Sequence, residues 1–256
     1  MIEDVGRLAQ LIIESKKIVV FTGAGISTES GIPDFRSPGG VWSRYDPEDF
    51  TIQKFLSSQE TRENIWKMSV EAGLLIEAKP NPTHYATAEL HRLGKLDCVV
   101  TQNIDNLHQK AGVPEDKVFE LHGNMQWVVC TGCRKRFPLP EVLQKVKEGM
   151  AVPHCPDCQS ILKPDVVFFG EALPQETLTE AIRRAQSCDL FIVIGSTLVV
   201  YPAAYMPAYA RKAGARLAIV NLTPTSLDHH TTVVIHGKAG EIMTRVMEKV
   251  RQVGQE

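Results

Sequence analysis

Four polar residues have the types and the spacing of a site that binds a polar ligand and moves a proton. Gln102, Asn103 and Asp105 follow the largely apolar segment 97–100, and His122 follows a second such segment, 117–121. Short runs of this kind are typical of buried strands. Ligands of an open parallel sheet bind in the crevice outside the carboxyl ends of its strands. We therefore expect the four side chains around one crevice, where a histidine can exchange protons near neutral pH.

Each of these residues also has a structural interpretation. Asn and Asp often cap helices and turns, and a single histidine is usually structural. The set after two strands, together with a glycine turn near the N-terminus, favours a functional site.

The glycine turn resembles the first half of a dinucleotide-binding motif. The apolar segment 18–21 runs directly into Gly23, Ala24 and Gly25. Glycines in this position let the backbone approach a pyrophosphate and direct amide groups at it. Thr28 stands where a third glycine is usual, and no acidic residue ends a second strand about 20 residues later. A tight turn after a strand is the alternative interpretation.

A proline- and glycine-rich segment, 31–42, follows this turn and is predicted to be a loop. It contains Phe35 and Arg36. A loop of this length beside a phosphate site is a candidate lid. In the alternative it is a connector, with Phe35 as an anchor and Arg36 paired to a surface acid.

Two Cys-x2-Cys pairs predict a metal site. Cys130 and Cys133 are separated by 21 residues from Cys155 and Cys158. Four thiolates at this spacing are typical of a tetrahedral zinc site, and a zinc with four sulfur ligands is structural because it keeps no open position. His154 is a weaker rival ligand. Disulfides and a DNA-reading zinc ribbon are the alternatives, but a reducing compartment argues against the first and few basic residues against the second.

Size and composition are those of an ordinary globular protein. The 256 residues allow one large domain with a smaller insert, and the net charge of −2 gives no broad basic field for nucleic acid. The longest apolar run, 190–201, is too short to cross a bilayer. Segment 1–14 carries early acids and does not resemble a signal peptide, so we expect a cytoplasmic protein. Cys98 and Cys188 stand alone and are expected to be inert core residues.

Hydrophobic periodicity predicts the elements that position these residues. Segment 2–14 is an amphipathic helix, and segment 44–80 is a helical module inserted into the main fold. Asn81 and Pro82 are the N-cap and first residue of a helix that Gly94 ends.

From Lys163 the main fold is expected to resume. A strand is predicted over 164–171, and helices alternate with strands thereafter. Further strand ends are expected at Gly195, at Asn221 and before Lys238. Such alternation predicts a doubly wound parallel sheet.

Taken together, the motifs resemble those of sirtuins, the NAD-dependent protein deacylases of the silent information regulator family. The motifs GAGIS, GIPDFR, TQNIDNLH, ELHGN, the two cysteine pairs, VVFFGE and GSTLVVYPAA occur in the family's order. The resemblance spans roughly residues 19–239 and is closest to a compact prokaryotic type. The third position of the glycine motif, Thr28, is usual in this family.

The resemblance implies a Rossmann-like NAD-binding domain and a smaller domain. The large domain would comprise residues 1–36, 84–123 and 165–256. The helical insert 37–83 and the zinc-binding insert 124–164 would form the small domain. NAD and an acyl-lysine peptide would enter the cleft between them from opposite sides.

The resemblance also implies a role for individual residues. His122 matches the catalytic base, and Asn103 is the second catalytic residue. The positions that match the family's NAD contacts are Gly23, Ala24, Gly25, Thr28, Phe35, Arg36, Gln102, Asn103, Ile104, Asp105, His122, Gly195, Ser196, Thr197, Asn221, Leu222, Lys238 and Ala239. The positions that match its peptide contacts are Val166, Phe168, Gly170, Glu171, Val199 and Tyr201.

The implied activity is NAD-dependent protein lysine deacetylation. Its products would be nicotinamide, the deacetylated lysine and O-acetyl-ADP-ribose. Mono-ADP-ribosyl transfer at the same site, and a non-catalytic NAD- and zinc-dependent binding module, remain the alternatives. The expected partners are acetyl-lysine proteins or peptides, with no membrane and no direct nucleic-acid contact, and a monomer is the expected state.

The acyl group is expected to be uncharged. Family members that prefer succinyl or malonyl groups carry a Tyr-x2-Arg pair in the helical insert, and Ser69 and Ala72 occupy about these positions here. Neither can hold a carboxylate.

Overall fold

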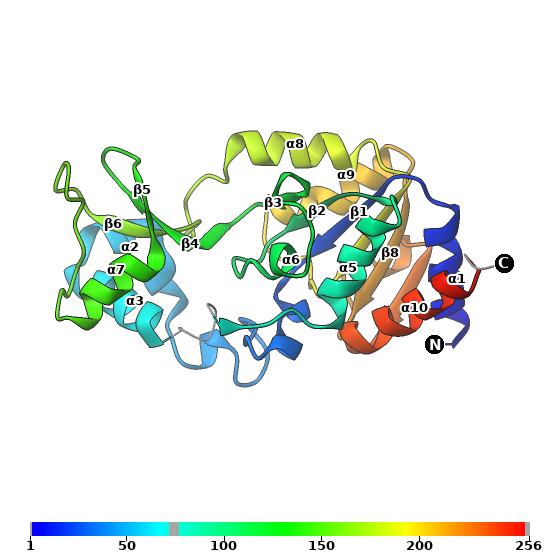
Figure 1. Ribbon diagram of the computed structural model, residues 1–256, viewed down its shortest axis with the longest axis horizontal. Coiled ribbons are helices and arrows are strands. Elements are labelled where there is room, and N and C mark those ends of the chain that lie inside the picture. The colour runs from blue at the N-terminus through cyan, green and yellow to red at the C-terminus, as the bar shows by residue number, and fades with distance from the viewer. Residues whose placement is uncertain (1, 72–76, 254–256) are drawn as a thin grey trace.

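A six-stranded parallel sheet is the largest element of the computed structural model, which describes residues 2–71 and 77–253 (Figure 1). The strand order is β3-β2-β1-β7-β8-β9, and every neighbouring pair is parallel. The order reverses between β1 and β7, which is the switch point where such sheets bind ligands. The doubly wound fold predicted from the sequence is confirmed. The strands run over β1 Ile18–Thr22, β2 Leu96–Thr101, β3 Val118–Glu120, β7 Leu190–Ile194, β8 Arg216–Asn221 and β9 Val233–His236.

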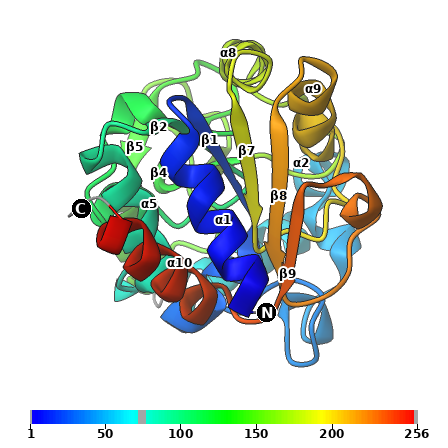
Figure 2. The ribbon, with the colours of Figure 1, turned by 90° about the vertical axis from the view of Figure 1, so that its right-hand side faces the viewer.

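Helices cover both faces of this sheet (Figure 2). Alternate residues of β1 point to opposite faces, so Ile18 and Val20 pack into one apolar cluster and Val19 and Phe21 into another. The first cluster contains α1, α5 and α10, and the second contains α8 and α9. These helices and the short α6 run over α1 Ile2–Glu14, α5 Pro82–Arg92, α6 Leu107–Lys110, α8 Gln175–Ala185, α9 Met206–Lys212 and α10 Ala239–Val253.

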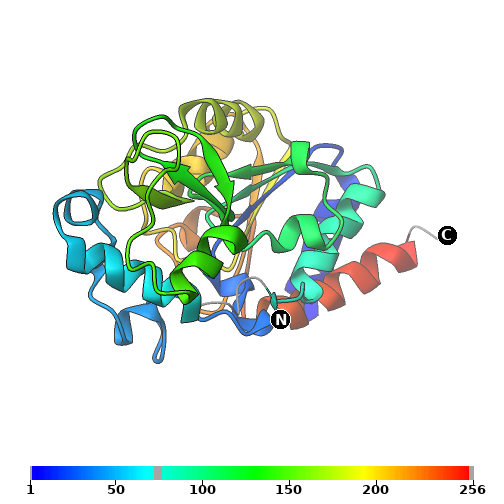
Figure 3. The ribbon, with the colours of Figure 1, turned by 60° about the vertical axis from the view of Figure 1, so that its left-hand side comes forward.

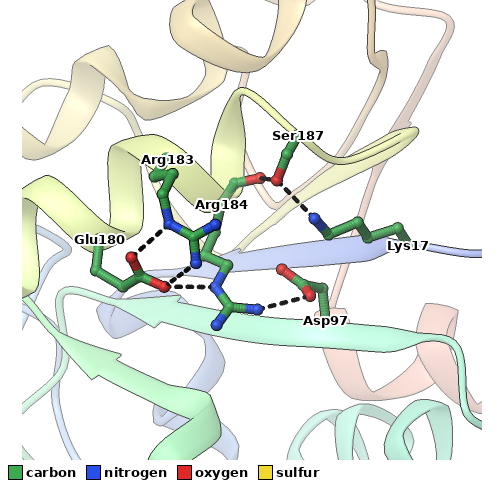
Figure 4. Close-up of polar contacts among 6 residues, drawn as sticks. All are labelled: Lys17, Asp97, Glu180, Arg183, Arg184 and Ser187. Carbon is green, nitrogen blue, oxygen red and sulfur yellow. Dashed lines mark hydrogen bonds and ion pairs between the residues drawn. The ribbon is translucent and has the colours of Figure 1, made fainter.

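Polar contacts fix helix α8 at the amino-terminal edge of the sheet (Figure 4). Arg184 Nη1 donates to Asp97 Oδ1 of β2 at 2.9 Å, and Arg184 Nε donates to Glu180 Oε1 at 2.7 Å. Nearby, Lys17 Nζ donates to Ser187 Oγ. These contacts lie at the opposite end of the strands from the predicted site. They therefore stabilise the scaffold and take no part in the site.

A second, antiparallel sheet lies apart from the first and has the order β5-β4-β6 (Figure 1). It lies together with three helices (Figure 3). Trp66 of α3 is buried among residues of β4 and α7. The helices and strands of this part run over α2 Ile52–Ser57, α3 Gln59–Glu71, β4 Gly123–Cys130, β5 Arg136–Pro138, α7 Leu139–Lys147 and β6 Leu162–Val166.

The strand expected over 164–171 was placed wrongly. The structure has β6 at Leu162–Val166, paired antiparallel with β4, so this strand belongs to the small sheet and not to the parallel one. A short apolar run has the same sequence pattern in a parallel and in an antiparallel sheet. Which sheet the strand joins depends on a pairing partner that is distant in the sequence.

The four cysteines of the two Cys-x2-Cys pairs come together beside the small sheet. Their sulfur atoms all lie within 4.8 Å of one another, with 3.4 Å between Cys130 and Cys158 and 3.7 Å between Cys133 and Cys155. Tetrahedral ligands at the usual Zn–S distance would lie about 3.8 Å apart. The donor set therefore fits one structural zinc ion. His154 lies outside the cluster, with Nδ1 3.0 Å from Val152 O.

Loss of one zinc ligand should unfold the small sheet. We expect Cys130→Ala to abolish zinc binding and to lower the melting temperature strongly, because ligand binding energy at a structural zinc is folding energy. Metal analysis and thermal denaturation measure the two effects. The control is Cys188→Ala, which changes a buried thiol outside the cluster. Undiminished stability of the metal-free protein would contradict a structural role for zinc.

Candidate active site

The turns after β1 and β7 touch each other through their backbones. Gly25 N donates to Gly195 O at 2.9 Å. A Cβ atom on Gly25 would lie 2.8 Å from Gly195 O, and one on Gly195 would lie 2.5 Å from Ile26 N. Gly195 also has a left-handed φ of 64°. Side chains are excluded here, which leaves a cradle of bare backbone at the switch point, as the sequence motif predicts.

Asn103 and Asp105 lie beside this turn and are linked by Ser27. Asn103 Nδ2 donates to Ser27 Oγ at 3.1 Å, and Ser27 Oγ donates to Asp105 Oδ2 at 2.6 Å. The other carboxylate oxygen of Asp105 accepts Leu107 N. Asn103 and Asp105 are each 8% exposed, so both side chains are held in place at the edge of the core. Ser27 was missed in the sequence, although its place two residues after the glycine turn was a signal.

Gln102 connects the two halves of the crevice. Its Nε2 donates to Ser196 Oγ at 2.8 Å, and its backbone N–H donates to Thr22 O. The carboxyl ends of β1, β2 and β7 therefore meet at one point, as expected from the strand-end positions of these residues.

His122 faces the same strand ends. Its Nδ1 lies 3.0 Å from Gln102 O. A carbonyl oxygen can only accept, so Nδ1 carries the proton of the neutral ring and Nε2 is left with a lone pair. Burial lowers the pKa of His122, and the Gln102 bond opposes this by favouring the charged form. The ring is thus neutral at neutral pH and suited to accept a proton.

The loop that contains Phe35 and Arg36 is tied to the small-sheet side by aromatic contacts. The ring of Trp42 lies 5.1 Å from that of Phe35 and 6.1 Å from that of Phe169. At its start, Asp34 Oδ1 accepts Arg36 N and Ser37 N, and Arg36 itself is exposed. These contacts hold the loop beside the segment that contains Phe169, and its role as a lid stays a prediction.

The residues predicted on the adenosine side follow the other strands. Asn221 ends β8 and donates from Nδ2 to Thr223 O, while Leu222 is exposed. Lys238 precedes α10, whose Gly240 N–H donates to Glu29 Oε1 from the segment after the glycine turn. Glu29 was not predicted.

The residues predicted on the peptide side lie on two separate segments. Val199 and Tyr201 are exposed after β7, and Val166 to Glu171 lie at and after the end of β6. Val167 N donates to His122 O at 2.9 Å, so the second segment is bonded directly to the histidine's backbone.

A buried cation missed in the sequence shapes this second segment. Lys163 is 4% exposed, and its Nζ donates to Val166 O at 2.5 Å and to Glu171 Oε2 at 2.9 Å. Glu171 also accepts Phe168 N at 2.7 Å. The Glu171 carboxylate thus forms hydrogen bonds that fold its own segment, with Lys163 and with the backbone of Phe168. A lysine in an otherwise ordinary strand gives no sequence signal for this role.

A cavity of about 320 Å³ opens beside Ile104 and Asp105. Its lining includes Ser69 of α3 and Lys110 of α6, whose Nζ donates to Ala78 O at 3.2 Å. Ala72, the second position compared with the Tyr-x2-Arg pair, lies outside the described residues.

Known proteins resemble this chain over nearly all of its length. The model of the Sir2 family matches residues 23–202. NAD-dependent protein deacylase 2 of Archaeoglobus fulgidus is 46% identical, over 100% of both chains. NAD-dependent protein deacetylase 1 of Pyrobaculum aerophilum is 45% identical, over 97% of this chain and 96% of the relative.

Solved structures agree with these relatives. One described as "Structural Basis for the Mechanism and Regulation of Sir2 Enzymes" has a TM-score of 0.90 and 46% identity, covering 99% of this chain and 100% of that one. Another, "Sir2-p53 peptide-NAD+", has a TM-score of 0.87 and 42% identity, covering 98% of both. With the family model covering more than half of its residues, the chain belongs to the Sir2 family.

Proposed function

We propose that His122 is the general base of the reaction that this Sir2-family enzyme performs, the NAD-dependent deacetylation of protein lysines. The products are nicotinamide, the deacetylated lysine and O-acetyl-ADP-ribose. The observation that supports this role is the hydrogen bond between His122 Nδ1 and Gln102 O. It leaves Nε2 as the acceptor, next to the strand ends where Asn103 and Asp105 are held.

The other residues at the strand ends have the chemistry needed to break two bonds, the one from ribose to nicotinamide and the amide bond of the acetyl-lysine. The bond from ribose to nicotinamide breaks through a cation-like transition state, and the Asp105 carboxylate, bonded to Ser27, can accept an N–H of the carboxamide. We assign Asn103 and Gln102 to the ribose. Holding the acetyl oxygen near the ribose C1′ is a proximity effect worth up to about 7–11 kcal/mol in the best cases. The acetyl oxygen bonds to C1′ as the bond to nicotinamide breaks. His122 then takes a proton from a ribose hydroxyl, and that oxygen bonds to the acetyl carbon. The bond from this carbon to the lysine nitrogen breaks, the lysine leaves as the amine with a proton returned from His122, and water adds to complete O-acetyl-ADP-ribose.

The NAD contacts follow the strand ends around the crevice. We assign the glycine turn and Thr28 to the pyrophosphate, because the glycines carry no side chain that would keep it away from the backbone. The loop with Phe35 and Arg36 suits a lid over the cofactor. The proposed adenosine contacts come after β7, β8 and β9, and they are Gly195, Ser196, Thr197, Asn221, Leu222, Lys238 and Ala239.

Acyl-lysine peptides are the substrates, and we propose that they bind between two segments. These are 166–171, which Lys163 shapes, and 199–201, in which Val199 and Tyr201 are exposed. A peptide added as a strand between them would be held mostly by its backbone, which gives little sequence selectivity.

The domain boundaries and the cellular setting are further proposals. The boundaries expected from the sequence are 1–36, 84–123 and 165–256 for the large domain and 37–83 and 124–164 for the small one. Because the small sheet begins at Gly123 and extends to Val166, we propose that two of these boundaries lie at 122 and 167. None of the six cysteines, which all lie in the described ranges, forms a disulfide, and this fits the proposed cytoplasmic location. Within residues 2–71 and 77–253, no helix has the length and apolarity needed to cross a membrane. A monomer without direct nucleic-acid contact stays a prediction.

Removal of the base should abolish turnover without abolishing NAD binding. We expect His122→Ala to lower kcat by about 10²–10⁴-fold, the usual contribution of a positioned acid or base. Deacetylation kinetics and NAD titration by calorimetry measure the two effects. His91→Ala, on α5, is the matched control and should behave as wild type. Near wild-type turnover of His122→Ala would show that another group is the base.

The pH dependence of kcat/KM should reflect the titration of the His122 imidazole. The neutral ring is the active form, so kcat/KM should be flat above the pKa of His122 and fall about tenfold per pH unit below it. Because burial lowers this pKa, the midpoint should lie below the ordinary value of about 6.5. Steady-state rates across the acid range locate it. A midpoint clearly above this value would contradict the proposed environment of His122.

The enzyme should prefer uncharged acyl groups. A succinyl carboxylate beside Ser69 would lose water without gaining the Tyr-x2-Arg pair, at a cost of at least about 1.4 kcal/mol, or tenfold in rate. We therefore expect acetyl-lysine peptides to react at least tenfold faster than succinyl-lysine peptides at equal concentration. Ser69→Ala should keep this preference. Faster succinyl removal would overturn it and point to Lys110 as the partner of the carboxylate.

A further inference from the structure

Two buried histidines lie directly behind the strand ends and have no part in the proposed chemistry. His84 of α5 is 0% exposed and His108 of α6 is 2% exposed. Their rings meet edge to face, with centroids 5.1 Å apart. Two imidazoles buried side by side need a physical reason, because an unpaired buried polar group lowers the stability of the fold.

The hydrogen bond to His84 fixes its tautomer. Nδ1 accepts the backbone N–H of Asn81 at 3.3 Å, so the proton of the neutral ring lies on Nε2. This bond is half of the capping box that starts α5. Asn81 Nδ2 in turn donates to Ile26 O at 2.6 Å and to Ser30 Oγ at 2.9 Å. His84 is therefore tied to the segment that follows the glycine turn.

His108 continues the network toward the crevice. Its Nε2 lies 2.9 Å from Thr22 Oγ1, and Thr22 Oγ1 donates to Thr101 Oγ1 at 2.8 Å. Thr101 Oγ1 also accepts the backbone N–H of Asn103 at 3.0 Å. Since Thr22 uses its own proton on Thr101, it accepts from His108 Nε2. His108 Nδ1 is then an acceptor and His84 Nε2 a donor, and the two rings meet edge to face without a hydrogen bond between these atoms.

Both rings are held in the neutral state. Burial lowers the pKa of His84 to about 4, opposed by the charge of Asp105, and burial together with His84 lowers that of His108 well below its usual range. A protonated His84 would also set an N–H against the N–H of Asn81. The network therefore keeps one pattern of donors and acceptors at neutral pH.

We propose that His84 and His108 are positioning residues that fix Asn103 and Asp105 at the nicotinamide end of the crevice. They touch no substrate: His108 acts through Thr22, Thr101 and the backbone of Asn103, and His84 acts on His108 by ring packing and on the segment after the glycine turn through Asn81. This inference rests on the proposed role of Asn103 and Asp105 in holding nicotinamide and ribose.

The network has the form expected of a positioning device rather than of a stabilising core. Apolar residues of similar size would fill the same space without buried polar atoms, and His84 Nε2 and His108 Nδ1 have no hydrogen-bond partner within the described parts of the chain. What the imidazoles provide is directional bonding on two sides of one ring contact: His84 bonds to Asn81, which bonds to the segment after the glycine turn, and His108 bonds to Thr22, which leads to residues 101–103. A reacting group misplaced by about 1 Å can lose about 10²-fold in rate, so such a link has kinetic value.

Two variants test the link at different points. His108→Phe removes both ring nitrogens, and Thr22→Val removes the relay hydroxyl with little change in shape. We expect each to lower kcat by about 10–100-fold and to weaken inhibition by added nicotinamide, with the KM of an acetyl-lysine peptide unchanged. If His108→Phe does not fold, Thr22→Val still decides the question.

Two further variants separate positioning from packing. Like Thr22→Val, the control Thr87→Val removes one buried hydroxyl. This hydroxyl lies on α5 and donates to Thr83 O within the helix, outside the network. It should lower the melting temperature slightly and leave kcat and nicotinamide inhibition as in wild type. At His84, glutamine can still accept the Asn81 N–H and leucine cannot, so His84→Gln should retain much more of kcat than His84→Leu.

The outcomes distinguish this inference from the function on which it rests. A wild-type enzyme that fails to deacetylate with NAD would refute the proposed function. An active wild type, with kcat and nicotinamide inhibition unchanged in both Thr22→Val and His108→Phe, would overturn the positioning role alone. Equal losses in Thr87→Val and Thr22→Val would also overturn it, because they would show a general effect of packing.

Discussion

The backbone contact between the turns after β1 and β7 is the constraint on which the rest of the site depends. Gly25 and Gly195 approach so closely that neither position has room for a side chain. This contact brings three parallel strands to one point and leaves backbone without side chains at the two glycines. Ser27, two residues further on, can then reach both Asn103 and Asp105. The polar ligand site is thus a consequence of a packing requirement at the point where the strand order reverses.

The small sheet begins at the catalytic edge of the large one. His122 is followed at once by β4, and Gly123, with φ 79°, pairs with Val166 so closely that a side chain there would collide with Asp165 O. The same strand ends at Cys130, one of the four zinc ligands. A zinc ion bound at these cysteines therefore stabilises the sheet that sets the backbone directly after His122. This gives a structural metal an effect on activity without any open coordination position.

Local patterns were sufficient to predict the parallel sheet, the glycine turn, the cysteine cluster and the Asn81 cap, because each depends on nearby residues or on fixed spacing. The strand over 164–171 was assigned to the wrong sheet, since its partner β4 lies about forty residues earlier along the chain. Lys163, His84 and His108 were not singled out for a related reason. A buried polar residue is meaningful only through the groups it meets, and these come from segments that the sequence does not connect.

Mass spectrometry of an acetyl-lysine peptide incubated with the enzyme, with and without NAD, tests the central claim most directly. We expect deacetylated peptide only when NAD is present, with one nicotinamide and one O-acetyl-ADP-ribose formed for each lysine released. Deacetylation that proceeds without NAD, or NAD cleavage that leaves the peptide acetylated and yields free ADP-ribose or ADP-ribosylated protein, would contradict it.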